Sequence, residues 1–180
     1  MAPISLESER LLLRRWQPTD LEPFAALNAD PAVMEYFPKP LTRDESDAFV
    51  DRIEDTFEQH DLGLWAVEPR DSGGFIGYVG LWPATFDAHF TPAIEVGWRL
   101  ANACWGNGYA PEAAQCALDD GFGRLGLDEI VSFTAVGNDR SRRVMTKVGL
   151  SHDEADDFDH PSVPVTSPLR RHVLYRLPAS

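Results

Sequence analysis

The sequence WGNGYAPEA, residues 105–113, places Gly106 and Gly108 directly ahead of a helix-forming run. The first turn of a helix has main-chain N–H groups without intrahelical partners, and the helix macrodipole is positive there. Glycine permits unusual backbone angles and lets an anion approach the main chain closely. This stretch is therefore a candidate phosphate-binding loop, and a tight turn without a ligand is the alternative.

Two common phosphate-binding motifs do not fit this loop. The dinucleotide motif G-x-G-x-x-G has Pro111 where its third glycine belongs. The P-loop needs Lys followed by Ser or Thr after its last glycine, and neither follows here. Pro111 itself suits the first turn of a helix, where its missing N–H does little harm.

Two side chains ahead of the loop could accept a proton. Glu95 lies in a strand-like segment, residues 93–100, and His89 lies six residues before it. Histidine and glutamate are frequent general bases in enzymes. The alternatives are a solvent-facing strand position for Glu95 and a surface loop position for His89.

An alternation of strands and helices must position these candidates. The strongest helix prediction covers residues 42–60, because Thr42 and Glu45 form a capping box ahead of an apolar stripe. The order of elements predicts a single α/β domain over residues 1–180, with a mixed, mostly antiparallel sheet of about six to seven strands and about four helices. The other expected elements are strands at 9–16, 63–69, 75–82, 93–100, 129–136 and 171–177, and helices at 19–28, 109–118 and 139–149.

Composition limits the class of protein. The formal net charge of −13 disfavours general binding to nucleic acid or an anionic membrane, and it is compatible with a cationic substrate. No apolar run approaches the roughly 18 residues that span a bilayer, and the first residues do not resemble a secretion signal. Cys104 and Cys116 lack metal-ligand spacing, so we expect free thiols in a cytoplasmic setting.

Residues 95–150 resemble the acyl-CoA-binding half of the GNAT acetyltransferases. The loop motif of that family, Gln/Arg-x-x-Gly-x-Gly/Ala, is matched by residues 105–110, with Trp105 in place of Gln or Arg. The segments AIEVGWRL and VGNDRSRRVMTKVGL resemble the branch that contains the ribosomal-protein N-terminal acetyltransferases. The order of elements also fits, so the resemblance covers nearly the whole chain.

The resemblance implies acetyl-CoA as cosubstrate and no metal. It implies that loop amides hold the pyrophosphate and that main-chain groups at the strand end pair with the pantetheine arm. Asn138 would hold the same arm, or alternatively cap the helix that follows it. The residues implied to bind the cofactor are Trp98, Arg99, Leu100, Trp105, Gly106, Asn107, Gly108, Tyr109, Ala110 and Asn138.

The resemblance also makes Glu95 the expected catalytic base. Many GNAT enzymes carry a tyrosine that protonates the departing thiolate, and Met145 occupies the matching position here. Ser141, one turn earlier, is the remaining hydroxyl near the thiol. Its alternative role is that of an ordinary residue in the first turn of a helix.

Two charged clusters complete the candidates. The basic cluster of Arg140, Arg142, Arg143 and Lys147 either meets nucleotide phosphates or forms a solvated helix face. The acidic segment 152–160 includes two histidines but lacks the turn glycine of a calcium loop, so we expect no metal there. We interpret this segment as a loop that shapes the acceptor site.

These observations predict an enzyme that transfers acetyl directly from acetyl-CoA to a primary amine in a ternary complex. An α-amine of a peptide, protein or small molecule is favoured over a lysine side chain, because it loses its proton more easily. The alternatives are a CoA-binding sensor or partner module without catalysis and a nucleotide-binding regulator. A homodimer is compatible with the sequence, and neither nucleic acid nor membrane is expected as a partner.

Overall fold

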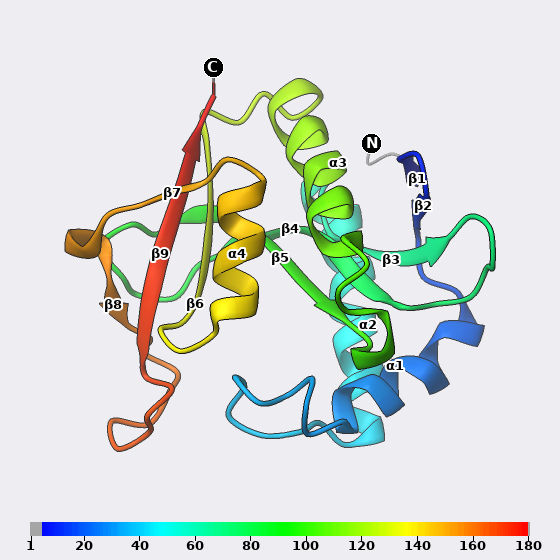
Figure 1. Cartoon of the computed structure of the whole chain (residues 1–180), viewed down its shortest axis with the longest axis horizontal. Coiled ribbons are helices and arrows are strands. Elements are labelled where there is room, and N and C mark those ends of the chain that lie inside the picture. Colours follow the sequence, from blue (N-terminus) through cyan, green and yellow to red (C-terminus); the bar gives the residue numbers. More distant parts are fainter. Residues whose placement is uncertain (1–4, 180) are drawn as a thin grey trace.

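A twisted sheet runs through the molecule and carries helices on both faces (Figure 1). The computed structural model describes residues 5–179. The strands are β1 (Ser5–Glu7), β2 (Leu11–Arg14), β3 (Leu64–Pro69), β4 (Gly77–Ala84), β5 (Ala93–Leu100), β6 (Glu129–Ala135), β7 (Ser151–His152), β8 (Phe158–Asp159) and β9 (Arg171–Pro178). The α-helices are α1 (Leu21–Ala29), α2 (Arg43–His60), α3 (Tyr109–Gly123) and α4 (Asp139–Lys147).

The strands follow the order β1-β2-β3-β4-β5-β6-β9-β7, and β8 also pairs with β9. Every pair is antiparallel except β5 and β6. This confirms the predicted α/β fold with a mostly antiparallel sheet and four α-helices. The described residues form nine strands rather than six to seven, because β1, β7 and β8 are only two or three residues long. Strands that short show no alternation that the sequence alone could reveal.

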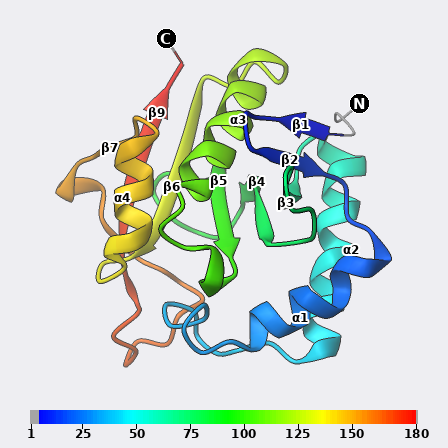
Figure 2. The ribbon, with the colours of Figure 1, turned by 45° about the vertical axis from the view of Figure 1, so that its right-hand side comes forward.

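The helices form two layers. In Figure 1, α3 and α4 lie in front of the sheet and α2 lies behind it, and Figure 2 shows α1 and α2 together on the side away from α4. On the α2 side, Phe57 packs against Trp65 of β3 with ring centroids 5.1 Å apart. On the α3 side, Gly121 lies so close to the sheet that a Cβ there would come within 2.7 Å of Ile130. No helix within residues 5–179 is long and apolar enough to cross a membrane.

Local sequence signals explain where the helices begin. Thr42 accepts a hydrogen bond from the Glu45 N–H, and the Glu45 side chain accepts one from the Thr42 N–H, so the predicted capping box begins α2. Helix α3 begins after Gly108, whose φ of 78° is left-handed and favours glycine. Both signals lie within a few residues of sequence.

The two parallel strands separate soon after they meet. Their register contains one pair, Glu95 with Val131. One residue further along each strand, the Ser132 hydroxyl donates a 2.8 Å hydrogen bond to the Val96 carbonyl. Beyond that point β5 and β6 share no ladder bonds among the described residues, so the main-chain edge of β5 toward β6 opens into a cleft.

Candidate active site

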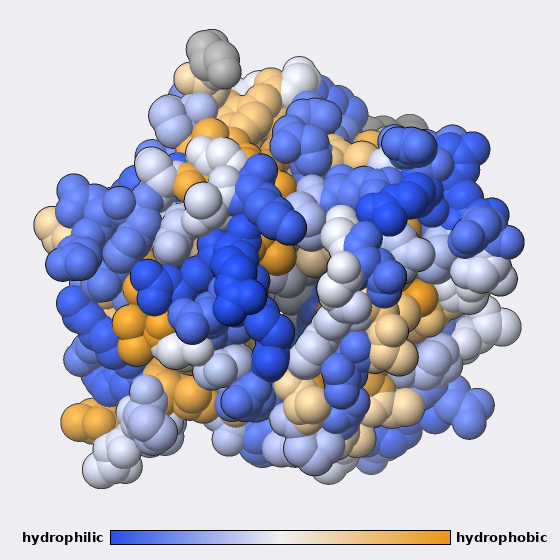
Figure 3. Space-filling model, viewed as in Figure 1, coloured by the Kyte–Doolittle hydropathy of each residue, from blue (hydrophilic) through white to orange (hydrophobic). Residues whose placement is uncertain are grey.

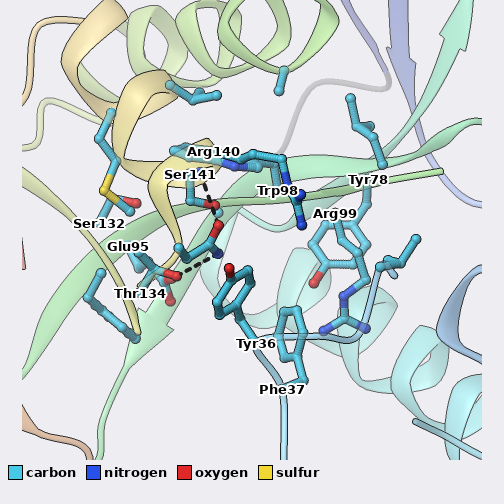
Figure 4. Close-up of a pocket in the computed structure, with 18 of the residues that line it drawn as sticks. Tyr36, Phe37, Tyr78, Glu95, Trp98, Arg99, Ser132, Thr134, Arg140 and Ser141 are labelled. Carbon is cyan, nitrogen blue, oxygen red and sulfur yellow. Dashed lines mark hydrogen bonds between the residues drawn. The ribbon is translucent and has the colours of Figure 1, made fainter. Parts of the chain in front are cut away.

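A cavity of about 700 Å³ occupies the cleft between β5 and β6. Its walls come from the end of β5, the loop before α3, the first turns of α4 and the segment between α1 and α2 (Figure 4). Figure 3 shows strongly hydrophilic residues gathered over α4, beside the opening toward α3. The separation of two parallel strands thus creates a site that carries groups from both layers of helices.

The predicted phosphate loop has the geometry of an anion site. Gly106 and Gly108 have φ angles of 80° and 78°, and a Cβ on Gly106 would meet no atom within 4 Å. Among the described residues, the main-chain N–H groups from Gly106 to Ala110 have no hydrogen-bond acceptor. Successive free N–H groups at the N-terminus of a helix favour a phosphate. Of the predicted loop residues, only Asn107 does not line the cavity, and its side chain donates to the Cys104 and Trp105 carbonyls.

Arg10, just before β2, supports this loop from outside. Its guanidinium pairs with Glu112 in the first turn of α3 at 2.6 Å and donates to the Asn107 carbonyl at 3.0 Å. It also lies 4.9 Å from the centre of the Tyr109 ring. Arg10 therefore neutralises a carboxylate that would otherwise repel a phosphate near the helix N-terminus. Sequence reasoning missed this contact, because the two ends of the ion pair are far apart in the chain.

Trp105 replaces the usual Gln or Arg of the motif and has a role of its own. Its indole N–H donates to the Leu100 carbonyl at 2.9 Å, and the Arg140 guanidinium stacks 4.4 Å from its ring. Arg143 and Lys147 also line the cavity, whereas Arg142 turns away and donates to the Val136 carbonyl. The basic cluster is thus divided, with three of its four members at the cavity.

The main chain of β5 offers two residues to a ligand in the cleft. Ala101 donates to Ile76 on the β4 side, and neighbouring strand residues direct their N–H and C=O groups to opposite edges. The main-chain N–H and C=O of Arg99 therefore face β4, where Arg99 pairs with Tyr78. The main-chain groups of Trp98 and Leu100 face the cleft. This differs from the expectation that all three residues present their main chain to pantetheine, because the direction alternates along a strand.

The N-terminus of α4 brings Asn138 and Ser141 to the cavity. The Asn138 side chain accepts from the Ser141 N–H at 3.2 Å and donates to the Thr134 hydroxyl at 2.9 Å (Figure 4). Asn138 is therefore a helix cap, which was one of its two predicted roles. The Ser141 hydroxyl has no hydrogen bond to the described residues, and Met145 is buried one turn further along.

Glu95 lies where the two strands part. Its side chain lines the cavity and makes no hydrogen bond or ion pair within the described chain. Burial disfavours the charged carboxylate and raises its pKa to about 8. The group is thus protonated in neutral solution and becomes a base as the pH rises through about 8. A strongly shifted, unpaired acid in a cavity is typical of a catalytic group.

Known proteins resemble this chain in sequence and fold. The Acetyltransferase (GNAT) domain family matches residues 10–151. Bacillus subtilis (strain 168) has a relative, the uncharacterized N-acetyltransferase YoaA, that is 31% identical over 157 residues and covers 85% of each chain. The chain belongs to the GNAT acetyltransferase family. This GNAT enzyme is accordingly an acetyl-CoA-dependent N-acetyltransferase.

Solved structures agree with the family assignment. An acetyltransferase of the GNAT family from Bacillus anthracis is 25% identical, with a TM-score of 0.80 over 97% of this chain and 98% of that one. The ribosomal-protein-S5-alanine acetyltransferase from Vibrio fischeri is 16% identical, with a TM-score of 0.77 over 99% of this chain and 98% of that one. The predicted resemblance to that branch is confirmed at the level of the fold.

Other candidates of the GNAT chain lie outside the cavity. His89 does not line it, and its ring approaches Asp156 at 3.4 Å instead. Side chains of the acidic segment 152–160 contact partners that can carry the opposite charge, for example His152 with Asp157 at 2.7 Å and Asp156 with Arg176 at 2.6 Å. His160 is the exception, because it faces both this cavity and a neighbouring hollow beside Glu95.

Sequence reasoning missed several residues of the GNAT cavity. Tyr36 and Phe37, between α1 and α2, and Tyr78 and Trp82, on β4, all line it. Figure 4 shows the hydroxyl groups of Tyr36 and Tyr78 pointing into the space between Glu95 and Arg99. Strand alternation could have placed Tyr78 opposite Arg99, but no local pattern indicates that the segment after α1 folds back over β5.

Proposed function

We propose that this enzyme acetylates an α-amine, of a peptide or protein N-terminus or of a small molecule, by direct transfer within a ternary complex. The amine nitrogen attacks the thioester carbonyl carbon, so that a C–N bond forms and the C–S bond breaks. Glu95 accepts the proton that the nitrogen loses. The Ser141 hydroxyl passes a proton to the departing thiolate and takes one from solvent in the same step. A thiol has a reference pKa of about 8.5, so the thiolate leaves with modest help.

The cavity offers groups for each part of acetyl-CoA. The free N–H groups from Gly106 to Ala110 are suited to the pyrophosphate, and Arg143 and Lys147 to the other phosphates. The cleft-facing N–H groups of Trp98 and Leu100 are suited to the pantetheine amides. The thioester would then lie near Glu95 and Ser141, where the strands part.

The pKa of Glu95 is the observation that carries this proposal. An α-ammonium has a reference pKa of about 7.7–8.0 and a lysine ammonium about 10.4. The pKa of Glu95, raised to about 8 by burial, is close to the first value and well below the second, so Glu95 accepts a proton more readily from an α-ammonium than from a lysine ammonium. The base of this site is therefore matched to an α-amine.

Direct transfer agrees with the state of the thiols. Cys104 lines the cavity, but burial raises the pKa of its thiol, so little thiolate is present to act as a nucleophile. Burial likewise raises the pKa of Cys116, which contacts the Glu7 carbonyl away from the cavity. Neither cysteine contacts a histidine within the described residues, so no activated thiol is available for an acetyl-enzyme intermediate.

Two forms of one lysine-containing peptide test the acceptor class. One form has a free N-terminus and an acetylated lysine, and the other has an acetylated N-terminus and a free lysine. We expect the first to be acetylated faster at pH 7, on the order of 100-fold, because the two amines differ by about 2.4–2.7 pKa units. The initial rates of CoA release measure this, and faster transfer to the free lysine would rule out the α-amine proposal.

The proposed acid is tested by Ser141→Ala. We expect kcat to fall roughly 2- to 12-fold, the equivalent of one hydrogen bond of about 0.5–1.5 kcal/mol, with acetyl-CoA affinity retained. The main-chain N–H of residue 141 still donates to the Asn138 side chain in this variant, so helix α4 is expected to keep its first turn. An unchanged kcat would mean that solvent, and not Ser141, protonates the thiolate.

A further inference from the structure

The floor of the cavity on the α2 side is formed by one face of β5. Glu95, Gly97 and Arg99 alternate with residues that face α3, so their side-chain positions lie on the same face. A Cβ placed on Gly97 would lie 3.6 Å from the Glu95 carboxyl oxygen Oε1, so the carboxyl group leans along the strand toward Arg99. Because Gly97 has no side chain, the space between the two charged residues stays open.

Arg99 is a buried cation without a counter-charge. Only 8% of the residue is exposed, and no carboxylate within the described chain pairs with it. One guanidinium nitrogen, Nη1, donates to the Asn28 side chain at 2.6 Å, while Nε is buried without any partner. The rings of Phe37 and Tyr78 lie 4.0 and 5.4 Å from the guanidinium carbon.

Neutral neighbours compensate this charge only in part. Aromatic faces and an amide oxygen stabilise a guanidinium, but a buried ion normally pairs with an opposite charge. Arginine side chains stay charged in proteins, so loss of a proton does not remove this cost. Arg99 lines the cavity, so a ligand can supply the missing anion there.

A second polar group nearby also lacks a partner. Only 6% of Tyr78 is exposed, and its hydroxyl makes no hydrogen bond within residues 5–179. In Figure 4 this hydroxyl points into the cavity beside the Arg99 guanidinium. A phenol hydroxyl donates well to a carboxylate, so Tyr78 and Arg99 together form two donors aimed at one place.

We propose that the acceptor carries a carboxylate that binds Arg99 and Tyr78 while its amine lies at Glu95. This inference rests on the proposed α-amine transfer and narrows the acceptor to amines with an acidic group, such as a peptide with an acidic residue after its N-terminus. Four residues of strand separate the two sites, about 13 Å between Cα atoms, and both side chains reach inward to shorten that span.

The charge of the cavity differs from that of the whole chain. The net charge of −13 would attract a basic polypeptide from a distance. Within the cavity, however, Glu95 is the sole acidic residue among the described lining residues. Arg143 and Lys147 are suited to the phosphates of acetyl-CoA and Arg140 pairs with Glu35 at 2.7 Å, so Arg99 is the lining cation that is left for an acceptor. Recognition at contact distance therefore favours an anionic acceptor.

Three dipeptide amides with an N-terminal alanine test the proposal on the intact enzyme. Their second residue is glutamate, glutamine or lysine, so they differ only in the charge offered to Arg99. We expect kcat/KM for the glutamate peptide to exceed that for the glutamine peptide about tenfold or more, as for a charge-assisted hydrogen bond, and the lysine peptide to be poorest. Calorimetry with the N-acetylated peptides in the presence of CoA measures affinity without turnover, and we expect the three peptides to rank in the same sequence.

Variants of Arg99 and Tyr78 test whether these residues cause the preference for the glutamate peptide. Arg99→Gln is expected to bring the glutamate-to-glutamine ratio to about one, Arg99→Lys to keep part of it, and Tyr78→Phe to reduce it. Arg52→Gln is the matched control, because Arg52 stacks 5.3 Å from the Phe49 ring but does not line the cavity. Circular dichroism checks each fold, and Arg99→Lys and Tyr78→Phe keep the test usable if Arg99→Gln does not fold.

The outcomes separate the two proposals. Transfer to all three peptides without a preference for glutamate, or with a preference for lysine, would overturn the role of Arg99 and leave α-amine transfer intact. A glutamate preference that survives in Arg99→Gln would also overturn it, as would a loss confined to acetyl-CoA affinity. Transfer to none of them, when the earlier peptide with a free N-terminus and an acetylated lysine is also inert, would instead overturn the proposed function.

Discussion

Replacing Glu95 by Gln is expected to lower kcat by on the order of 10²–10⁴-fold, the usual contribution of a positioned general base. The amide has nearly the same shape but cannot accept the proton of the amine. Acetyl-CoA affinity is expected to change little, because Glu95 lies at the point of transfer and not among the phosphate-binding groups. Steady-state kinetics with a free N-terminal peptide and calorimetry with acetyl-CoA measure the two effects separately.

The fold of this variant is expected to be retained. Glu95 makes no hydrogen bond within the described residues, and burial of its charge already costs free energy, as the raised pKa shows. Glu129→Gln is the matched control, because Glu129 lies on the neighbouring strand β6, pairs with Arg176 and does not line the cavity. A Glu95→Gln enzyme with full activity would exclude Glu95 as the base and leave bulk water as the proton acceptor.

Replacing Gly108 by Val is expected to weaken CoA binding on the order of 100-fold, the equivalent of two charge-assisted hydrogen bonds of about 1.5 kcal/mol each. The φ of 78° suits glycine, and a β-branched residue there would distort the loop, with its Cβ 3.5 Å from Nη2 of the supporting Arg10. Isothermal titration of the variant with CoA measures the loss.

A second glycine separates strain from ligand contact. Gly126 has a φ of 64°, and a Cβ there would meet no atom within 4 Å, so Gly126→Val carries similar backbone strain at a residue that does not line the cavity. We expect Gly126→Val to lose stability and keep its CoA affinity. Equal affinity losses in both variants would mean that global destabilisation, and not the loop, explains the effect.

The parts of the fold that sequence predicted depend on local signals. The strand at 93–100 and the helix that follows the Thr42 cap have the bounds expected from them, because period and cap lie within a few residues. Strands β7 and β8 were not predicted, since each consists of two residues that pair with β9. Their pairing depends on tertiary contact with a strand that begins at Arg171, well beyond them in the chain.

The residues of the site also divide into those that local sequence predicts and those that depend on tertiary contacts. The glycines of the phosphate loop and the cap Asn138 are recognisable in sequence, because their roles depend on the adjacent main chain. Tyr36 belongs to the cavity only because the segment after α1 packs near Gly137, which no local pattern indicates. The side chain of Arg99 is an intermediate case: alternation along β5 places it on the face of Glu95, but its lack of a counter-charge appears only in the structure.

The central claim is that Glu95, with a pKa of about 8, is the base of an α-amine acetyltransferase. The most direct test is the pH dependence of kcat/KM for a dipeptide amide that begins with trifluoroalanine, whose fluorines keep the α-amine neutral, so that only the enzyme titrates. Since the carboxylate exists only above its pKa, we predict that kcat/KM rises about tenfold per pH unit to a plateau above about pH 8 in the wild type. In Glu95→Gln, we predict that it is low and independent of pH through this range. A wild-type profile without this rise, or the same rise in Glu95→Gln, would contradict the account.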